Sequence, residues 1–199
     1  MRGIVAFSEY TWSGDKRSKG EIKAAYRQRE FSKVLADSSY AFIDELEKPV
    51  AFWKNALLKG DKRNYLATME NPMEEGVIDL PDPNNGGLWA QKHENRLNEA
   101  AQLINSTDSI AEKIKLMKGK AVRNSYSLEV YEQVNAIASF SPKTLLALKA
   151  YDNSDNPTEK LESMKQLRAL QKEFETVREN LESVYAKVRI LEKPDGYIL

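Results

Sequence analysis

Hydrophobic residues recur along most of the chain at spacings of three and four, which is the period of an amphipathic α-helix. The pattern is clearest after Asn156-Pro157, where a capping residue and a first-turn proline precede a long apolar stripe. Its members are Leu161, Met164, Leu167, Leu170, Phe174, Val177, Leu181, Val184, Val188 and Leu191. At about 1.5 Å per residue the stripe predicts a helix about 45 Å long, which needs partner helices of comparable length.

Two shorter helices are predicted before residue 60. The first covers residues 18–36 and begins with a Ser-x-x-Glu sequence, the spacing of a capping box. The second covers residues 40–58 and contains Pro49, which removes a backbone donor, so we expect a kink or a split near Glu47. Its expected inward-facing residues are Phe42, Ile43, Leu46, Val50, Trp53 and Leu57.

Two long helices are predicted in the middle of the chain. One covers residues 88–121, and the polar run 105–108 is a point where it could be interrupted. Its apolar stripe is Leu97, Ala101, Ile104, Ala111, Ile114 and Ala121. The other covers residues 127–151, and we expect a bend or a break at Pro142. Together with the last helix these two predict an antiparallel bundle.

Two segments lack the helical period. Residues 60–87 are rich in proline, asparagine and glycine and predict one long irregular loop. We expect its apolar residues to pack on the helices; these are Tyr65, Met69, Met73, Val77, Ile78 and Leu80. Residues 3–7 form a short apolar run that predicts a buried strand, followed by a turn at 11–15.

The predicted fold is therefore mainly α, with long antiparallel helices forming a bundle, a short N-terminal strand and one long irregular loop. We divide the chain into residues 1–15, a strand and turn, and residues 16–199, a helical bundle domain with the irregular loop at about 60–87. A chain of 199 residues can bury about 70% of its unfolded surface, so a self-supporting core is expected.

Composition narrows the range of functions. The 30 basic and 30 acidic residues cancel and are spread along the chain, which argues against a nucleic-acid partner. No run approaches the roughly 20 apolar residues of a membrane-spanning helix, so we expect no membrane span. With no cysteine, the sequence contains no thiolate nucleophile and no cysteine-ligated metal site.

Polar side chains suggest no complete catalytic centre, and we expect no catalytic residue, metal or cofactor. His93 is the only histidine, which excludes a site with two histidine ligands, and we interpret it as a partly exposed helix residue. Adjacent carboxylates occur at Asp44-Glu45 and Glu74-Glu75, and paired carboxylates can act on glycosidic bonds. Neighbouring helix residues point in different directions, however, so solvated charge is the favoured interpretation.

The N-terminal segment places one carboxylate among three aromatic residues. Phe7, Tyr10 and Trp12 surround Glu9, and aromatic rings stack on sugar faces while a carboxylate accepts hydrogen bonds from hydroxyl groups. These four residues are therefore candidates for substrate binding. The alternative is that the three aromatic residues belong to the core and Glu9 is exposed.

At these residues the sequence resembles the end of the catalytic barrel in family 20 glycoside hydrolases, the β-N-acetylhexosaminidases. Their last barrel strand carries a Trp-x-Glu motif, often followed by Tyr, that contacts the terminal sugar. Here residues 7–10 read Phe-Ser-Glu-Tyr, with Phe7 in place of the tryptophan, and residues 3–6 would be the strand. Residues 41–47 and 70–73 are similar to the helical region that follows the barrel in exported bacterial members.

The resemblance implies a non-catalytic role. The family's His-x-Gly-Gly-Asp-Glu signature, which supplies its polarising Asp and acid Glu, is absent from this sequence. The chain would then be a helical accessory domain of a carbohydrate-cleaving enzyme that supports the barrel or assembly, from a parent protein exported to the periplasm or cell surface. Its partners would be the catalytic barrel of that parent or a self-associated copy, with a carbohydrate at Glu9. The alternative is an independent helical protein–protein interaction module.

Overall fold

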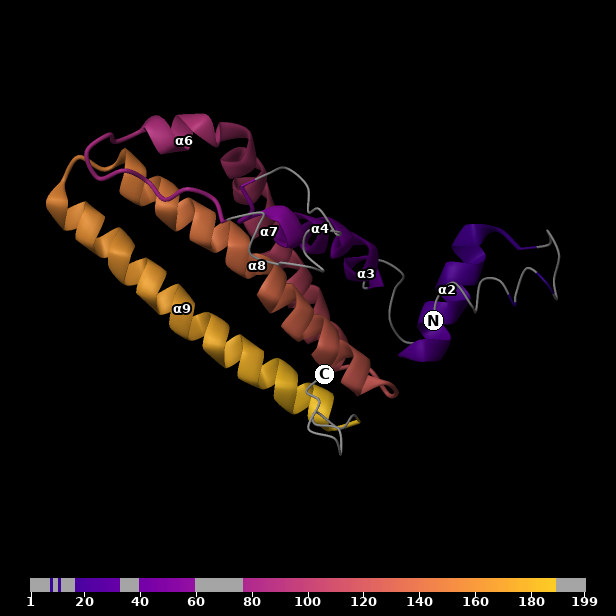
Figure 1. Cartoon of the computed structure of the whole chain (residues 1–199). Helices are drawn as coiled ribbons and strands as arrows, with labels where there is room; N and C mark the ends of the chain where they lie inside the picture. The colour runs from indigo at the N-terminus through magenta and orange to yellow at the C-terminus, as the bar shows by residue number, and fades with distance from the viewer. Residues whose placement is uncertain (1–7, 9–10, 12–16, 33–39, 60–76, 189–199) are drawn as a thin grey trace, which may run out of the picture.

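The protein is mainly α-helical, as predicted (Figure 1). The computed structural model describes residues 8, 11, 17–32, 40–59 and 77–188. Its helices are α2 (Lys19–Glu30), α3 (Phe42–Glu45), α4 (Glu47–Asn55), α6 (Leu88–Lys92), α7 (Glu94–Lys118), α8 (Ser125–Asn153) and α9 (Pro157–Ala186). Within these residues β pairing is limited to an isolated antiparallel bridge between Leu58 and Val77. No described helix has the length and apolar character needed to cross a membrane.

Helix α8 is the centre of the molecule (Figure 1). It packs against α7, α9, α4 and α6, whereas α9 packs against α8 without a comparable contact to α7. The connections 119–124 and 154–156 are short, so α7, α8 and α9 follow one another as antiparallel neighbours. The central position of α8 explains why its buried residues are distributed around the helix, whereas α9 buries only Ser163 and Val184 fully.

Two hydrophobic clusters form the core. One joins α3 to the second half of α7 and the start of α8, and its buried members are Phe31, Tyr40, Phe42, Ile43, Leu46, Ile110, Ile114, Met117 and Leu128. The other joins α4, α6, the start of α7 and the end of α8, with buried members Ala56, Ile78, Trp89, Ala90, Leu97, Ala100, Leu145 and Leu148. Both clusters are built across the α7–α8 contact, which therefore holds the fold together.

Hydrogen bonds to Asp152, near the C-terminal end of α8, hold the start of α6 in place. Asp152 is buried, and its carboxylate accepts a hydrogen bond from the backbone N–H of Ala90 at 2.7 Å. Its carbonyl oxygen accepts a second bond from the N–H of Gly87 at 2.9 Å. Gly87 has a φ of 83°, a left-handed conformation that glycine adopts without strain. A side chain from another helix thus satisfies a donor in the first turn of α6.

Helix starts agree with the local sequence signals. Ser18 and Glu21 form a reciprocal capping box, with Ser18 N–H donating to the Glu21 carboxylate at 2.7 Å. These bonds lower the pKa of Glu21 from its ordinary value. The Asn156 side chain accepts a bond from the N–H of Thr158, and Pro157 begins α9. The predicted split near Glu47 is also confirmed, since α3 ends at Glu45 and α4 starts at Glu47.

Several boundaries differ from the predictions because tertiary packing outweighs local propensity. Helix α2 ends at Glu30, six residues earlier than expected, although residues 33–36 lie outside the described part. Helix α8 continues through the buried Pro142 without a break, held between α7 and α9. The predicted helix 88–121 is divided at His93, whose φ of −107° and ψ of 18° are not helical. It is not interrupted at 105–108.

The inward-facing residues were predicted correctly only in part. Trp53 was expected in the core and is 40% exposed, while its neighbour Ala56 is buried. Ala101 and Ala111 are exposed, and the stripe that α7 buries consists of Leu97, Ala100, Leu103, Thr107, Ile110, Ile114 and Met117. Of the loop residues Ile78 is buried as expected, but Val77 and Leu80 are 61% and 74% exposed. Tyr65, Met69 and Met73 lie outside the described residues.

The N-terminal predictions fall mostly outside the described part. Residues 3–7, predicted to form a strand, are not described, so the strand stays a prediction. Ser8 and Thr11 are exposed and have helical backbone, although Thr11 was expected to begin a turn.

Candidate binding sites

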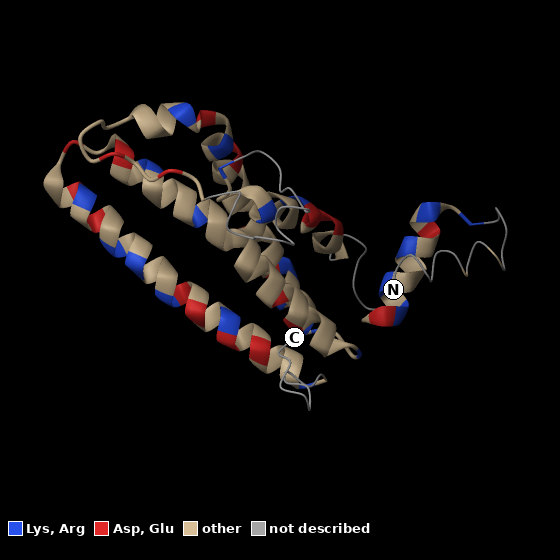
Figure 2. Ribbon diagram, viewed as in Figure 1, with Lys and Arg blue, Asp and Glu red and all other residues tan. Residues whose placement is uncertain are grey.

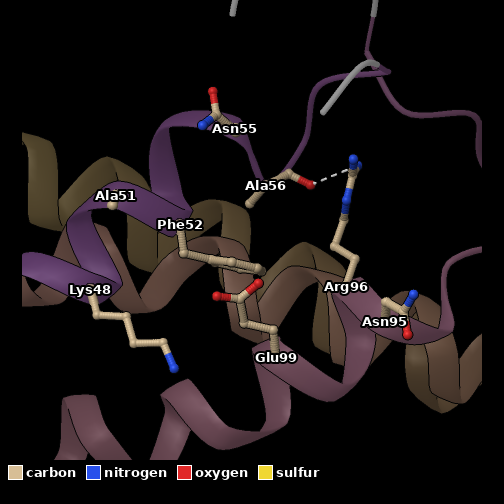
Figure 3. A pocket seen from close by; sticks show the side chains of 8 residues that line it. All are labelled: Lys48, Ala51, Phe52, Asn55, Ala56, Asn95, Arg96 and Glu99. Atoms are coloured by element: carbon tan, nitrogen blue, oxygen red, sulfur yellow. Dashed lines mark hydrogen bonds between the residues drawn. The ribbon is translucent and has the colours of Figure 1, made fainter. Parts of the chain in front are cut away.

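A polar pocket of about 400 Å³ lies between α4 and α7 (Figure 3). Its lining residues are Lys48, Ala51, Phe52, Asn55, Ala56, Asn95, Arg96 and Glu99. Arg96 anchors one wall, because its Nη1 atom donates to the carbonyl oxygens of Ala56 at 3.2 Å and Leu58 at 2.8 Å. A cation at these carbonyls also suits the partial negative charge at the C-terminal end of α4. The pocket therefore has a fixed basic corner.

Opposite charges and an aromatic ring meet in this pocket. Figure 3 shows the Phe52 side chain and the Glu99 carboxylate extending toward one another from α4 and α7. Lys48 and Glu99 are exposed, and neither has an ion-pair partner among the described residues. The amides of Asn55 and Asn95 add donors and acceptors at the rim. Such a lining can hold a small polar molecule that has one apolar face.

An apolar trough runs between α7, α8 and α9. It has a volume of about 470 Å³ and is lined by Ile104, Lys143, Leu146, Ala147, Gln166, Ala169, Leu170 and Glu173. Lys143 and Glu173 form an ion pair at 2.5 Å at its edge, and Phe140 packs on Phe174 with ring centroids 4.6 Å apart. The trough exists because α9 contacts α8 and leaves the space beside α7 open. The apolar side chains that line the trough are of the kind found inside helical bundles, and a further helix could cover them.

A second apolar groove lies at the other end of the α8–α9 contact. It is lined by Tyr126, Ser127, Val130, Tyr131, Leu181, Tyr185 and Val188. Tyr131 also packs edge-on against the buried Phe42, with centroids 5.5 Å apart, so the groove floor belongs to the core. Both grooves border α9, so apolar side chains of α8 and α9 remain accessible at two places along their contact.

His93 lies at the junction of α6 and α7 rather than in a catalytic arrangement. Its ring packs on Trp89 with centroids 4.9 Å apart, and Trp89 Nε1 donates to the carbonyl oxygen of Asp79. Burial, followed by the nearby charges of Arg96 and Lys92, lowers the pKa of His93 from its ordinary value. The buried Nε2 atom has no hydrogen-bond partner among the described residues. His93 is thus partly buried, and its surroundings favour the neutral form of its ring.

The adjacent carboxylates of α3 diverge, as predicted. Asp44 accepts bonds from Lys23 at 3.3 Å and Arg27 at 2.6 Å, which ties α2 to α3. Glu45 pairs instead with Lys113 of α7 at 2.6 Å. Each carboxylate therefore serves a different structural contact, and the two do not converge on a common ligand position. Glu74-Glu75 lies outside the described residues.

The predicted sugar-binding residues remain predictions. Phe7, Glu9, Tyr10 and Trp12 all lie outside the described residues. Within the described ranges, no three histidine or carboxylate side chains gather in a way that could hold a metal ion. The pocket and the trough were not predicted, because their walls come from helices that are far apart in sequence and carry no local motif.

Comparison with known proteins found no matching family, no matching curated protein and no matching solved structure.

Proposed function

We propose that this chain is a non-catalytic helical accessory module of a carbohydrate-cleaving enzyme and that it supports the catalytic barrel by binding it. The resemblance of residues 3–12, 41–47 and 70–73 to family 20 glycoside hydrolases favours this partner. The proposal assigns no chemical step to this chain. Its contribution would be to cover and stabilise another folded polypeptide.

One observation supports the proposal most strongly. Helix α9 packs on α8, and an apolar groove lies beside α9 near each end of this contact. Leu146 of α8 and Leu170 of α9 line the trough from facing helices, and Ile104 of α7 lines its third side. Covering such apolar surface releases about 25 cal/mol for each Å² removed from water. A partner element laid along the trough would therefore gain binding energy from side chains that the fold already orders.

A titration with a separately produced family 20 barrel tests the proposal. Ala169 is exposed at the trough, so Ala169→Arg blocks the space without removing a core contact. Ala111 is an exposed alanine of α7 outside the trough, and Ala111→Arg is the matched control. We expect saturable binding of the unchanged chain and of Ala111→Arg, and a loss of at least about tenfold in affinity for Ala169→Arg. Equal binding by both variants would contradict the proposal.

An independent helical interaction module is the second candidate. The observation in its favour is that both core clusters are formed from side chains of this chain's own helices and connections. A chain with its own core can act on partners other than a barrel. No binding to the barrel, together with cooperative unfolding of the isolated chain, would favour this candidate over the first.

A further inference from the structure

The outer face of α9 carries a regular stripe of exposed residues. At 100° per residue, the positions opposite the buried Ser163 and Val184 recur at spacings of four and three. They are Leu161, Lys165, Arg168, Lys172, Glu175, Glu179, Glu182 and Ala186, and all are exposed. Figure 2 shows α9 along one edge of the molecule, with charged residues over its length. This outer stripe is distinct from the apolar trough.

The charges of the outer stripe are ordered along the helix. Lys165, Arg168 and Lys172 occupy its first half, and Glu175, Glu179 and Glu182 occupy its second half. The stripe is symmetric about the midpoint between Lys172 and Glu175, because every basic position has an acidic position at the same distance on the other side. The terminal members Leu161 and Ala186 are related in the same way.

Only the central pair of this order, Lys172 and Glu175, is close enough to interact within one helix. Arg168 and Glu179 are eleven positions apart, or about 16 Å along the axis, which is too far for an ion pair. Lys165 pairs locally with Glu162 at 3.3 Å, and Glu182 lies 3.8 Å from Arg178, but these are exposed contacts of a single helix. Arg168, Lys172 and Glu179 have no ion-pair partner among the described residues.

We infer that the outer stripe of α9 is a surface for a second copy of this chain, bound with its α9 antiparallel. In that alignment Lys172 faces Glu175 of the second copy, Arg168 faces Glu179, and Lys165 faces Glu182. An antiparallel pair of identical helices is related by a two-fold axis, so each of these ion pairs occurs twice in the interface. A parallel alignment would place like charges together, so the charge order selects the antiparallel one.

Apolar residues flank the charged part of this interface. Leu161 and Met164 are 53% and 44% exposed near the start of α9, where the antiparallel copy presents Ala186 and Ser183. These contacts occur at both ends of the paired helices. The interface is small and mainly ionic, so we expect weak, reversible association that depends on salt.

Charge reversal tests the inference by sedimentation velocity over a range of protein concentrations. One variant carries Lys165→Glu, Arg168→Glu and Lys172→Glu, and the other carries Glu175→Lys, Glu179→Lys and Glu182→Lys. Each alone places like charges opposite each other, so we expect association at least about tenfold weaker than that of the unchanged chain. An equimolar mixture of the two restores opposite charges and should associate as strongly as the unchanged chain.

A control variant lowers the net charge as much as the first variant does, but at exposed residues of other elements, with Lys54→Glu, Lys115→Glu and Lys120→Glu. It should associate like the unchanged chain, and circular dichroism verifies the helix content of each variant. The unchanged chain gives a second readout, because its association should fall as salt is raised from about 0.1 M to about 1 M. A chain that stays monomeric at every concentration, or a mixture that fails to associate, overturns the inference. Neither result bears on binding of a barrel at the trough.

Discussion

At the scale of single residues, buried polar groups link helices that are far apart in sequence. Asn135 of α8 donates to the carbonyl oxygen of Thr107 in α7 at 2.9 Å, and both residues are buried. Thr107 in turn donates to the carbonyl oxygen of Ile104 at 2.9 Å. These bonds explain why the polar run 105–108 did not interrupt α7, because its one buried member is satisfied inside the helix pair.

Asp152 should be among the most sensitive polar residues. Asp152→Ala leaves the N–H of Ala90 without its partner, and an unsatisfied buried donor costs about 1–3 kcal/mol of unfolding free energy. Asp155→Ala removes an exposed carboxylate three residues away and serves as the control, with a change below about 0.5 kcal/mol. Urea unfolding followed by circular dichroism measures both. Similar stability of the two variants would show that Asp152 does not hold α6.

The pH dependence of stability should depend on His93. Its pKa is lowered in the folded protein, so the unfolded chain binds more protons as the pH falls through about 6.5. The stability contribution of neutral His93 is therefore present above that pH and is lost on acidification. It is the only histidine, so His93→Gln should flatten the dependence between about pH 5 and pH 7. A variant with the same slope as the unchanged chain would contradict this assignment.

At the scale of elements, sequence signals identified helix starts better than helix ends. Ser18 and Asn156 cap helices through bonds to backbone groups two or three residues away, so their effect is visible in the sequence. Pro49 falls in the first turn of α4, where a missing N–H costs little. Pro142 also lacks a backbone N–H, but it lies in the interior of α8. The packing of α8 against α7 and α9 outweighs the cost of this missing hydrogen bond.

Helix α9 should open more readily than α7 and α8. It buries only Ser163 and Val184 fully and depends on one neighbouring helix, whereas α7 and α8 contribute to both core clusters. Segments with few buried contacts unfold locally at lower free energy than the core. We expect hydrogen exchange to be at least about tenfold faster in the middle of α9 than in the middle of α8. Equal protection would mean that α9 is held by more than its contact with α8.

At the scale of the whole molecule, periodicity predicted the helical class and the antiparallel order of α7, α8 and α9. It could not predict the polar pocket, since Phe52 and Glu99 meet only when α4 packs beside α7. Nor could it place Trp53, which the period puts on the inner face but the packing of α4 leaves exposed. A binding surface between two helices depends on which of their faces pack together. The hydrophobic period of one helix does not specify which helix it packs against.

We propose that this chain acts by binding a polypeptide along the trough beside α9, and methyl NMR is the sharpest test of this proposal. Spectra of the chain are compared with and without a family 20 barrel. We expect the methyl signals of Ile104, Leu146 and Leu170 to shift in a saturable manner, and those of Leu116, an exposed leucine of α7 outside the trough, to stay unchanged. Shifts at Leu116 but not in the trough, or no shifts at all, would contradict it.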